Sequence, residues 1–157
     1  MKVTWLFALA LAGIPTVAQA QTRVSEKAGA WEVTGEGGDC GIGLMNQTGL
    51  LMIVSPATGG ENQGGIMISK MGIDVPDGPG ATLEIADTGA FAGAHALVGT
   101  RADSVYWLAF PTASTVDTFS DAFRLKVTRD GKTQVDMQVT GFAAARAALK
   151  RCVESTR

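Results

Sequence analysis

The chain has 157 residues, with 13 Lys and Arg against 15 Asp and Glu, one His and two Cys. The charges are scattered, which excludes the basic stripe of a nucleic-acid-binding protein and the polybasic segment of a membrane-surface protein. One histidine and two cysteines cannot form a closed zinc site without carboxylate ligands. We therefore expect no metal, no cofactor and no nucleic-acid partner.

The first twenty residues show the three zones of a secretory signal peptide. Lys2 gives a basic start, residues 3–12 form an apolar run, and residues 18–20 (Ala-Gln-Ala) form a small-x-small cleavage site. No run reaches the roughly 18 unbroken apolar residues that a membrane span needs. We expect cleavage near Ala20/Gln21, a periplasmic or secreted protein without a membrane span, and a single β-rich domain over residues 21–157.

Alternating and glycine-rich segments predict the first strands. Residues 21–29 are polar and predict a frayed N-terminal segment, and the alternation of Trp31-Glu32-Val33 predicts that the domain begins there with a strand. Residues 35–43 (GEGGDCGIG) predict a glycine-rich turn. Two apolar runs, 42–45 and 50–54, surround a polar connection at 46–49 and predict a β-hairpin.

The same pattern continues toward the C-terminus. Two alternating runs surround Asp130-Gly131, and an Asp-Gly pair between such runs is a strong hairpin signal. A short helical turn is expected at 118–123. Further strands are expected at 66–70, 81–86, 94–99, 105–110, 123–128 and 133–140. These short strands predict a mainly β fold, an antiparallel β-sandwich or barrel.

One segment, residues 142–153 (FAAARAALKRCV), predicts a C-terminal α-helix. Phe142, Ala145, Leu149 and Cys152 recur at spacings that place them on one helical face. In an oxidising compartment, two cysteines most often pair, so we expect a Cys40–Cys152 disulfide that closes the fold. The alternative is one reactive thiol, but no histidine or basic residue adjoins Cys40 to favour a thiolate.

His95 is the only histidine, so a serine or cysteine catalytic triad that uses histidine would have to include it. It lies in an alternating stretch, and no serine in the chain has the G-x-S-x-G setting of a nucleophile. We therefore assign no catalytic residue and treat a hydrolase that uses His95 as the third-ranked function.

Two further features allow more than one interpretation. Four methionines are expected within apolar strand runs, where methionine fills gaps in a core, although thioethers can also bind copper(I): Met45, Met52, Met67 and Met71. A polar, glycine-rich stretch is either a recognition loop or a flexible connection: Gly59, Gly60, Glu61, Asn62, Gln63, Gly64 and Gly65.

The stretch from Phe119 to Cys152 carries a resemblance to a known family. A phenylalanine near a short helix, two strands around an Asp-Gly turn, and Gly141-Phe142-Ala143-Ala144 lead into an alanine-leucine helix; an early Trp31-x-Val33 precedes a cysteine. This arrangement resembles the C-terminal part of the invasion-associated locus B family of small exported proteobacterial proteins. The resemblance implies a non-enzymatic periplasmic protein with a β-rich fold, and it supplies no catalytic residue.

Together these features predict a non-catalytic exported protein that binds a partner protein or ligand on a disulfide-stapled β scaffold. The expected partner is an envelope or extracellular protein. The alternative is an inhibitor of an exported hydrolase, with residues 59–65 entering the active site of the enzyme.

Overall fold

The computed structural model describes residues 23–36, 39–55, 64–86 and 89–155. Within these ranges the chain forms two 3₁₀ turns, η1 (Gly89–Phe91) and η2 (Ala113–Thr118), and one α-helix, α1 (Phe142–Ser155). The strands are β1 (Arg23–Ala28), β2 (Trp31–Glu36), β3 (Asp39–Met45), β4 (Leu50–Ser55), β5 (Gly65–Lys70), β6 (Gly78–Ala86), β7 (Gly93–Thr100), β8 (Val105–Ala109), β9 (Phe123–Arg129) and β10 (Lys132–Val139).

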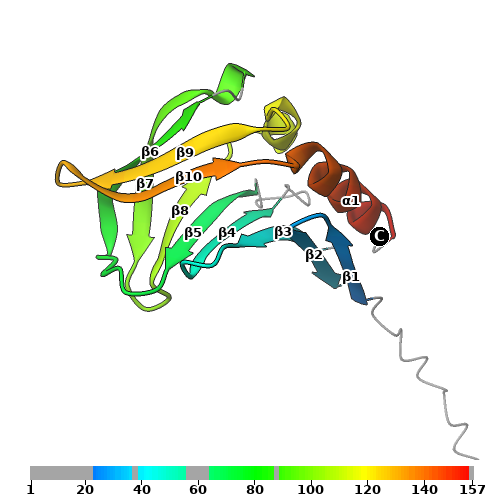
Figure 1. The fold of residues 1–157 in the computed structure, drawn as a ribbon, viewed down its shortest axis with the longest axis horizontal. Helices are drawn as coiled ribbons and strands as arrows, with labels where there is room; N and C mark the ends of the chain where they lie inside the picture. The colour runs from blue at the N-terminus through cyan, green and yellow to red at the C-terminus, as the bar shows by residue number, and fades with distance from the viewer. Residues whose placement is uncertain (1–22, 37–38, 56–63, 87–88, 156–157) are drawn as a thin grey trace, which may run out of the picture.

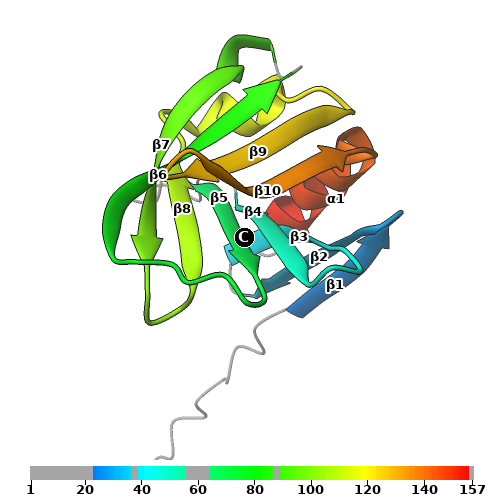
Figure 2. The same cartoon turned by 60° about the vertical axis from the view of Figure 1, so that its left-hand side comes forward.

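All ten strands belong to one antiparallel sheet, in the order β1-β2-β3-β4-β5-β8-β7-β6-β9-β10. The predicted mainly β fold with a C-terminal helix is therefore confirmed. The sheet curls on itself, with α1 lying beside β1, β2 and β3 at one end (Figures 1 and 2). Lys70 of β5 donates to the Gln134 carbonyl of β10 at 3.2 Å, which joins distant strands across the curl. One continuous curled sheet, with β1 and β10 as its two edges, resembles an open barrel more than two separate sheets.

Two predicted hairpins are present, and local chemistry explains both. Asp130 and Gly131 both have positive φ, 49° and 71°, as a two-residue turn between β9 and β10 requires. In the turn between β3 and β4, the Asn46 carboxamide oxygen accepts from the backbone N–H groups of Thr48 (2.9 Å) and Leu50 (3.0 Å). The Asn46 side chain thus satisfies backbone N–H groups of the turn.

Three expectations for individual segments were wrong. Residues 23–28, expected to be frayed, form β1, because an edge strand gains backbone hydrogen bonds from β2 whatever its side chains. Most of the glycine-rich stretch 35–43 lies in β2 and β3 rather than in a turn. The helical turn expected at 118–123 lies earlier, in η2, where the Thr112 and Thr115 hydroxyls contact each other at 3.1 Å and help to cap the turn.

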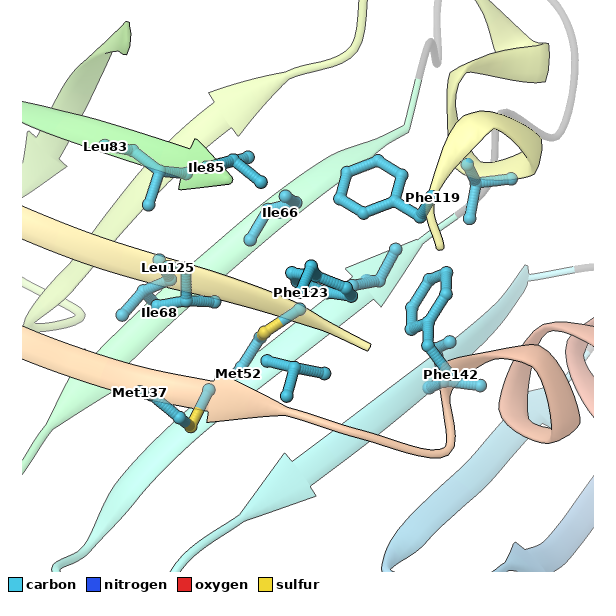
Figure 3. Packing of buried hydrophobic residues seen from close by; sticks show 14 of the residues in the cluster. Met52, Ile66, Ile68, Leu83, Ile85, Phe119, Phe123, Leu125, Met137 and Phe142 are labelled. Atoms are coloured by element: carbon cyan, nitrogen blue, oxygen red, sulfur yellow. The ribbon is translucent and has the colours of Figure 1, made fainter. Parts of the chain in front are cut away.

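The concave side of the sheet contains the hydrophobic core. In β2 and β4 every second side chain points inward and is buried, as the pleat of a strand requires. All the phenylalanines in the described residues form a chain of ring contacts with Trp31 at the α1 end of the core: Phe91, Phe110, Phe119, Phe123 and Phe142. Figure 3 shows Phe119, Phe123 and Phe142 among the packed core side chains.

The helix closes the core at this end. It begins at Phe142, as the sequence predicts, and ends at Ser155, two residues beyond the predicted end. Phe142 packs edge-on against Trp31, with ring centroids 5.4 Å apart, and the Trp31 indole N–H donates to the Thr140 carbonyl at 3.0 Å. These contacts hold the β10–α1 connection against β2. None of the helices in the described ranges has the length and apolar character that crossing a membrane requires.

Candidate functional site

Cys40 of β3 and Cys152 of α1 form a disulfide, which confirms the predicted pairing. Both residues are buried, 5% and 1% exposed, and their Cα atoms are 6.1 Å apart. Gly35 of β2 lies directly against the bridge, since a Cβ there would fall 2.6 Å from the Cys40 sulfur and closer still to the Cys152 sulfur. The bridge therefore joins the last turns of α1 to the start of the sheet, and its burial fits a structural role rather than a reactive one.

His95 lies at the η1 end of β7. Its Nε2 is 3.0 Å from the Phe91 carbonyl oxygen, and its ring stacks on the Phe91 ring with centroids 4.2 Å apart. These contacts orient the imidazole toward its own loop. In the described part of the chain, His, Cys, Asp and Glu side chains form no group of three that could hold a metal ion.

The glycine-rich stretch predicted as a recognition loop lies mostly outside the described residues. Of its members, only Gly64 and Gly65 are described, and both are buried. The Gly64 carbonyl accepts from the Phe110 N–H at 3.1 Å. A Cβ at Gly65 would lie 2.6 Å from Cζ2 of Trp107, so glycine there lets the indole approach the backbone of β5.

Two adjacent rows of outward residues are uncharged across five neighbouring strands, β3, β4, β5, β8 and β7. Paired residues form a continuous row across them: Gly43, Ile53, Met67, Trp107 and Val98. The adjacent row contains Met45, Leu51, Ser69, Val105 and Thr100. Neither row holds an ionisable side chain. We call these two rows the outer face.

An outer face of this composition is unusual for a sheet side that faces water. Antiparallel strands with one solvated side normally carry polar residues there. Here Met45 is 69% exposed, and Met71, which directly follows β5, is 82% exposed. An apolar surface left open on a monomeric protein commonly marks an interaction site.

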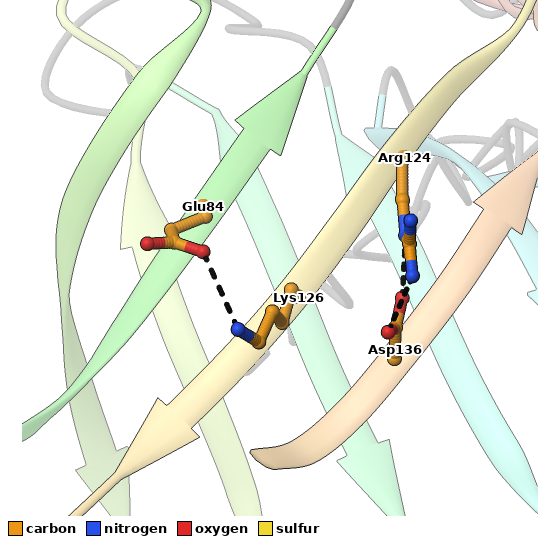
Figure 4. A network of polar contacts seen from close by, with 4 residues as sticks. All are labelled: Glu84, Arg124, Lys126 and Asp136. Atoms are coloured by element: carbon orange, nitrogen blue, oxygen red, sulfur yellow. Dashed lines mark hydrogen bonds and ion pairs between the residues drawn. The ribbon is translucent and has the colours of Figure 1, made fainter. Parts of the chain in front are cut away.

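Charged side chains flank the outer face on both sides. On β6, β9 and β10, Lys126 lies 3.8 Å from Glu84, and the Arg124 guanidinium donates two 2.7 Å hydrogen bonds to Asp136 (Figure 4). The hydrogen bond from Arg124 and its positive charge lower the pKa of Asp136 from its usual value. On the opposite side, β1 and β2 carry exposed charges. The uncharged outer face is therefore bounded rather than continuous around the molecule.

One end of the outer face is hollowed. A groove of about 360 Å³, lined mostly by apolar atoms, lies between Met45, Leu51, Met71 and Ile73. Met71 is fixed there by its N–H, which donates to the Gly49 carbonyl at 3.2 Å. We call this hollow the methionine groove.

The interpretation of the methionines as core filler was correct for Met52 and wrong for Met45 and Met71. Met52 points inward from β4 and is fully buried, and Met67 is half-buried on the outer face. Met45 occupies an outward position of β3 opposite Leu51, and Met71 lies past the end of its strand. An apolar run alone does not tell which of its members point outward.

The sequence does contain a signal for the outer face, in strand runs that are apolar at every position rather than at every second one. Residues 50–54 (LLMIV), 66–68 (IMI) and 105–110 (VYWLAF) are continuous apolar runs. Continuous runs are typical of strands that are buried on both faces. The described residues form a core on the inner face, so these runs could have predicted a second apolar face, which includes the half-buried Ile53 and Trp107.

Comparisons of the chain with family models, with curated proteins and with solved structures found no match. The resemblance to the invasion-associated locus B family stays a prediction.

Proposed function

We propose that this protein is a non-catalytic exported protein that binds a partner protein of the cell envelope or the extracellular space through its outer face. The observation that carries the proposal is the uncharged row Gly43, Ile53, Met67, Trp107 and Val98 across five strands. The apolar runs 50–54, 66–68 and 105–110 place apolar side chains on this face as well as on the inner face, which carries the core.

The chemistry of the outer face defines the kind of partner. The face has no ionisable side chain in its two rows, so a charged partner surface would lose hydration there without gaining an ion pair. The partner surface should therefore be apolar at its centre. The charged strands on both sides supply the polar rim that protein interfaces have.

The three-zone leader and the buried disulfide support export. We propose cleavage near Ala20/Gln21 and function in the periplasm or outside the cell. N-terminal sequencing of protein from the envelope fraction should start at or near Gln21. Finding the chain with Met1 intact in the cytoplasmic fraction would contradict this part of the proposal.

The binding face is tested by adding charge to it. A Met45→Lys/Val98→Lys protein places two ammonium groups at exposed positions of the outer face, where the fold itself needs no apolar side chain. A Thr82→Lys/Thr133→Lys protein adds the same charge at exposed positions of β6 and β10 and serves as the control. Each tagged mature protein is incubated with envelope extract, and the captured proteins are quantified.

Wild type and the control should capture the same partner, and the outer-face variant should lose it at least tenfold, since burying an unpaired charge costs well over 1.4 kcal/mol. Equal capture by all three proteins would refute the outer face as the binding site. A captured hydrolase that loses activity at one-to-one stoichiometry would identify the protein as an inhibitor.

A further inference from the structure

Two methionines on the rim of the methionine groove are highly exposed. Met71 is 82% exposed and Met45 is 69% exposed, whereas Met52 is 0% and Met137 is 8% exposed. The only other methionine of the mature chain, Met67, is half-buried on the same outer face. The protein therefore presents two open thioethers and keeps two others inside its core.

Both exposed methionines lie at the hairpin between β3 and β4. Met45 directly precedes the turn, which is fixed by the hydrogen bonds of Asn46. Met71 crosses over the same turn, and a Cβ at Gly49 would lie 3.0 Å from its sulfur. Gly49 also has a positive φ of 72°. Glycine at this position thus allows both the turn and the close approach of the Met71 side chain.

We propose that Met45 and Met71 form a site of reversible oxidation by peroxide-class oxidants, and that their oxidation weakens apolar binding at the methionine groove. In each reaction the sulfur lone pair attacks one peroxide oxygen and the O–O bond breaks. A sulfur–oxygen bond forms, sulfur is oxidised by two electrons, and hydrogen peroxide is reduced to water. Methionine sulfoxide reductases restore the thioether: two electrons from a dithiol, which becomes a disulfide, break the sulfur–oxygen bond, and the oxygen leaves as water.

The effect on binding follows from the change in polarity. A thioether is an adaptable apolar group, and methionine-rich surfaces accept varied apolar partners. A sulfoxide is polar and prefers water, so two of them on the rim beside Leu51 and Ile73 oppose the burial of an apolar side chain in the groove. This second part of the proposal rests on the proposed binding function of the outer face, whereas the oxidation site does not.

The oxidation site is tested by peptide mass spectrometry on the native mature protein during exposure to hydrogen peroxide. Met45 and Met71 should form sulfoxide at least ten times faster than Met52 and Met137, with Met67 between them. In denaturant all five should react at similar rates, which shows that the fold causes the difference. Native rates at Met45 and Met71 as slow as those of Met52 and Met137 would overturn the site.

The effect on the groove is tested with the apolar-surface dye 1-anilinonaphthalene-8-sulfonate. Peroxide treatment should weaken dye binding to the wild type severalfold, and methionine sulfoxide reductase should restore it. The Met45→Leu/Met71→Leu protein keeps similar apolar volume without an oxidisable sulfur, so its dye binding should not respond to peroxide.

The possible failures have different consequences. Sulfoxide at both positions with unchanged dye binding would overturn the proposed effect on the groove and leave the oxidation site. Unchanged partner capture by Met45→Lys/Val98→Lys would instead refute the proposed binding function. It would leave the oxidation site intact, because the oxidation rates are measured on the wild type without a partner.

Discussion

Removing the Cys40–Cys152 bridge should cost the protein a large part of its stability. The bridge joins residues separated by 112 positions. For a closed loop of this length, the chain-entropy relation gives about 16 cal/mol/K, or about 5 kcal/mol at 25 °C, from restriction of the unfolded chain. Native domains have only about 5–15 kcal/mol of stability in total, so the bridge accounts for a third of it or more.

The change to make is Cys40→Ala/Cys152→Ala, which leaves no unpaired thiol. We expect its free energy of unfolding to fall by about 3–5 kcal/mol and its melting temperature by roughly 10–20 °C. Guanidinium denaturation and calorimetry measure both quantities. Wild type that has been reduced in denaturant, alkylated and refolded provides a comparison without a sequence change. A double variant within about 1 kcal/mol of the wild type would refute the loop-entropy reasoning.

The structure also predicts where the variant loosens first. Near its start, α1 is held by Phe142 in the aromatic cluster and by Arg146, which donates to the carbonyls of Asp117 (3.0 Å) and Phe119 (2.8 Å). Near its end, besides the bridge, α1 has two exposed ion pairs, Arg151 with Glu26 and Lys150 with Asp117, and such pairs contribute little. Trypsin should therefore cut the variant within the last turns of α1 before it cuts the sheet. First cleavage in a strand would contradict this order.

Three further predictions concern single side chains. Gly35→Ala should lower the free energy of unfolding by about 1–3 kcal/mol, because its Cβ meets both sulfurs of the bridge. The loss should be smaller in the Cys40→Ala/Cys152→Ala background, and equal shifts of the guanidinium midpoint in both backgrounds would contradict this. Tyr106→Phe should leave the free energy of unfolding unchanged or raise it, because the buried hydroxyl has no hydrogen-bond partner among the described residues. A loss above about 1 kcal/mol would contradict this. Arg124→Gln should raise the pKa of Asp136 toward its usual value, as carboxyl NMR titration would show, and an unchanged pKa would contradict this. Because Arg124 lowers that pKa, the pair stabilises the fold above the usual carboxyl range, and this stabilisation is lost as the pH falls through the lowered value.

The sequence alone determined the features that depend on neighbouring residues. The Asp130-Gly131 turn, the hairpin around Asn46 and the helix from Phe142 are all set within a few positions of the chain, by turn chemistry and by side-chain periodicity. The pairing of Cys40 with Cys152 could also be predicted, because a chain with only two cysteines offers one internal pair.

Tertiary structure alone decided which apolar side chains are left uncovered. The run at 50–54 is apolar at every position, so the sequence gives no preference for the side of the sheet that carries the core; pairing with β3 and β5 sets it. The polar residues of β1 gave no strand signal either, since its stability comes from backbone pairing with β2. Met45 and Met71 lie in or beside apolar runs like that of Met52, and only the curl of the sheet separates the exposed thioethers from the buried one, because burial depends on contacts between segments far apart in the chain.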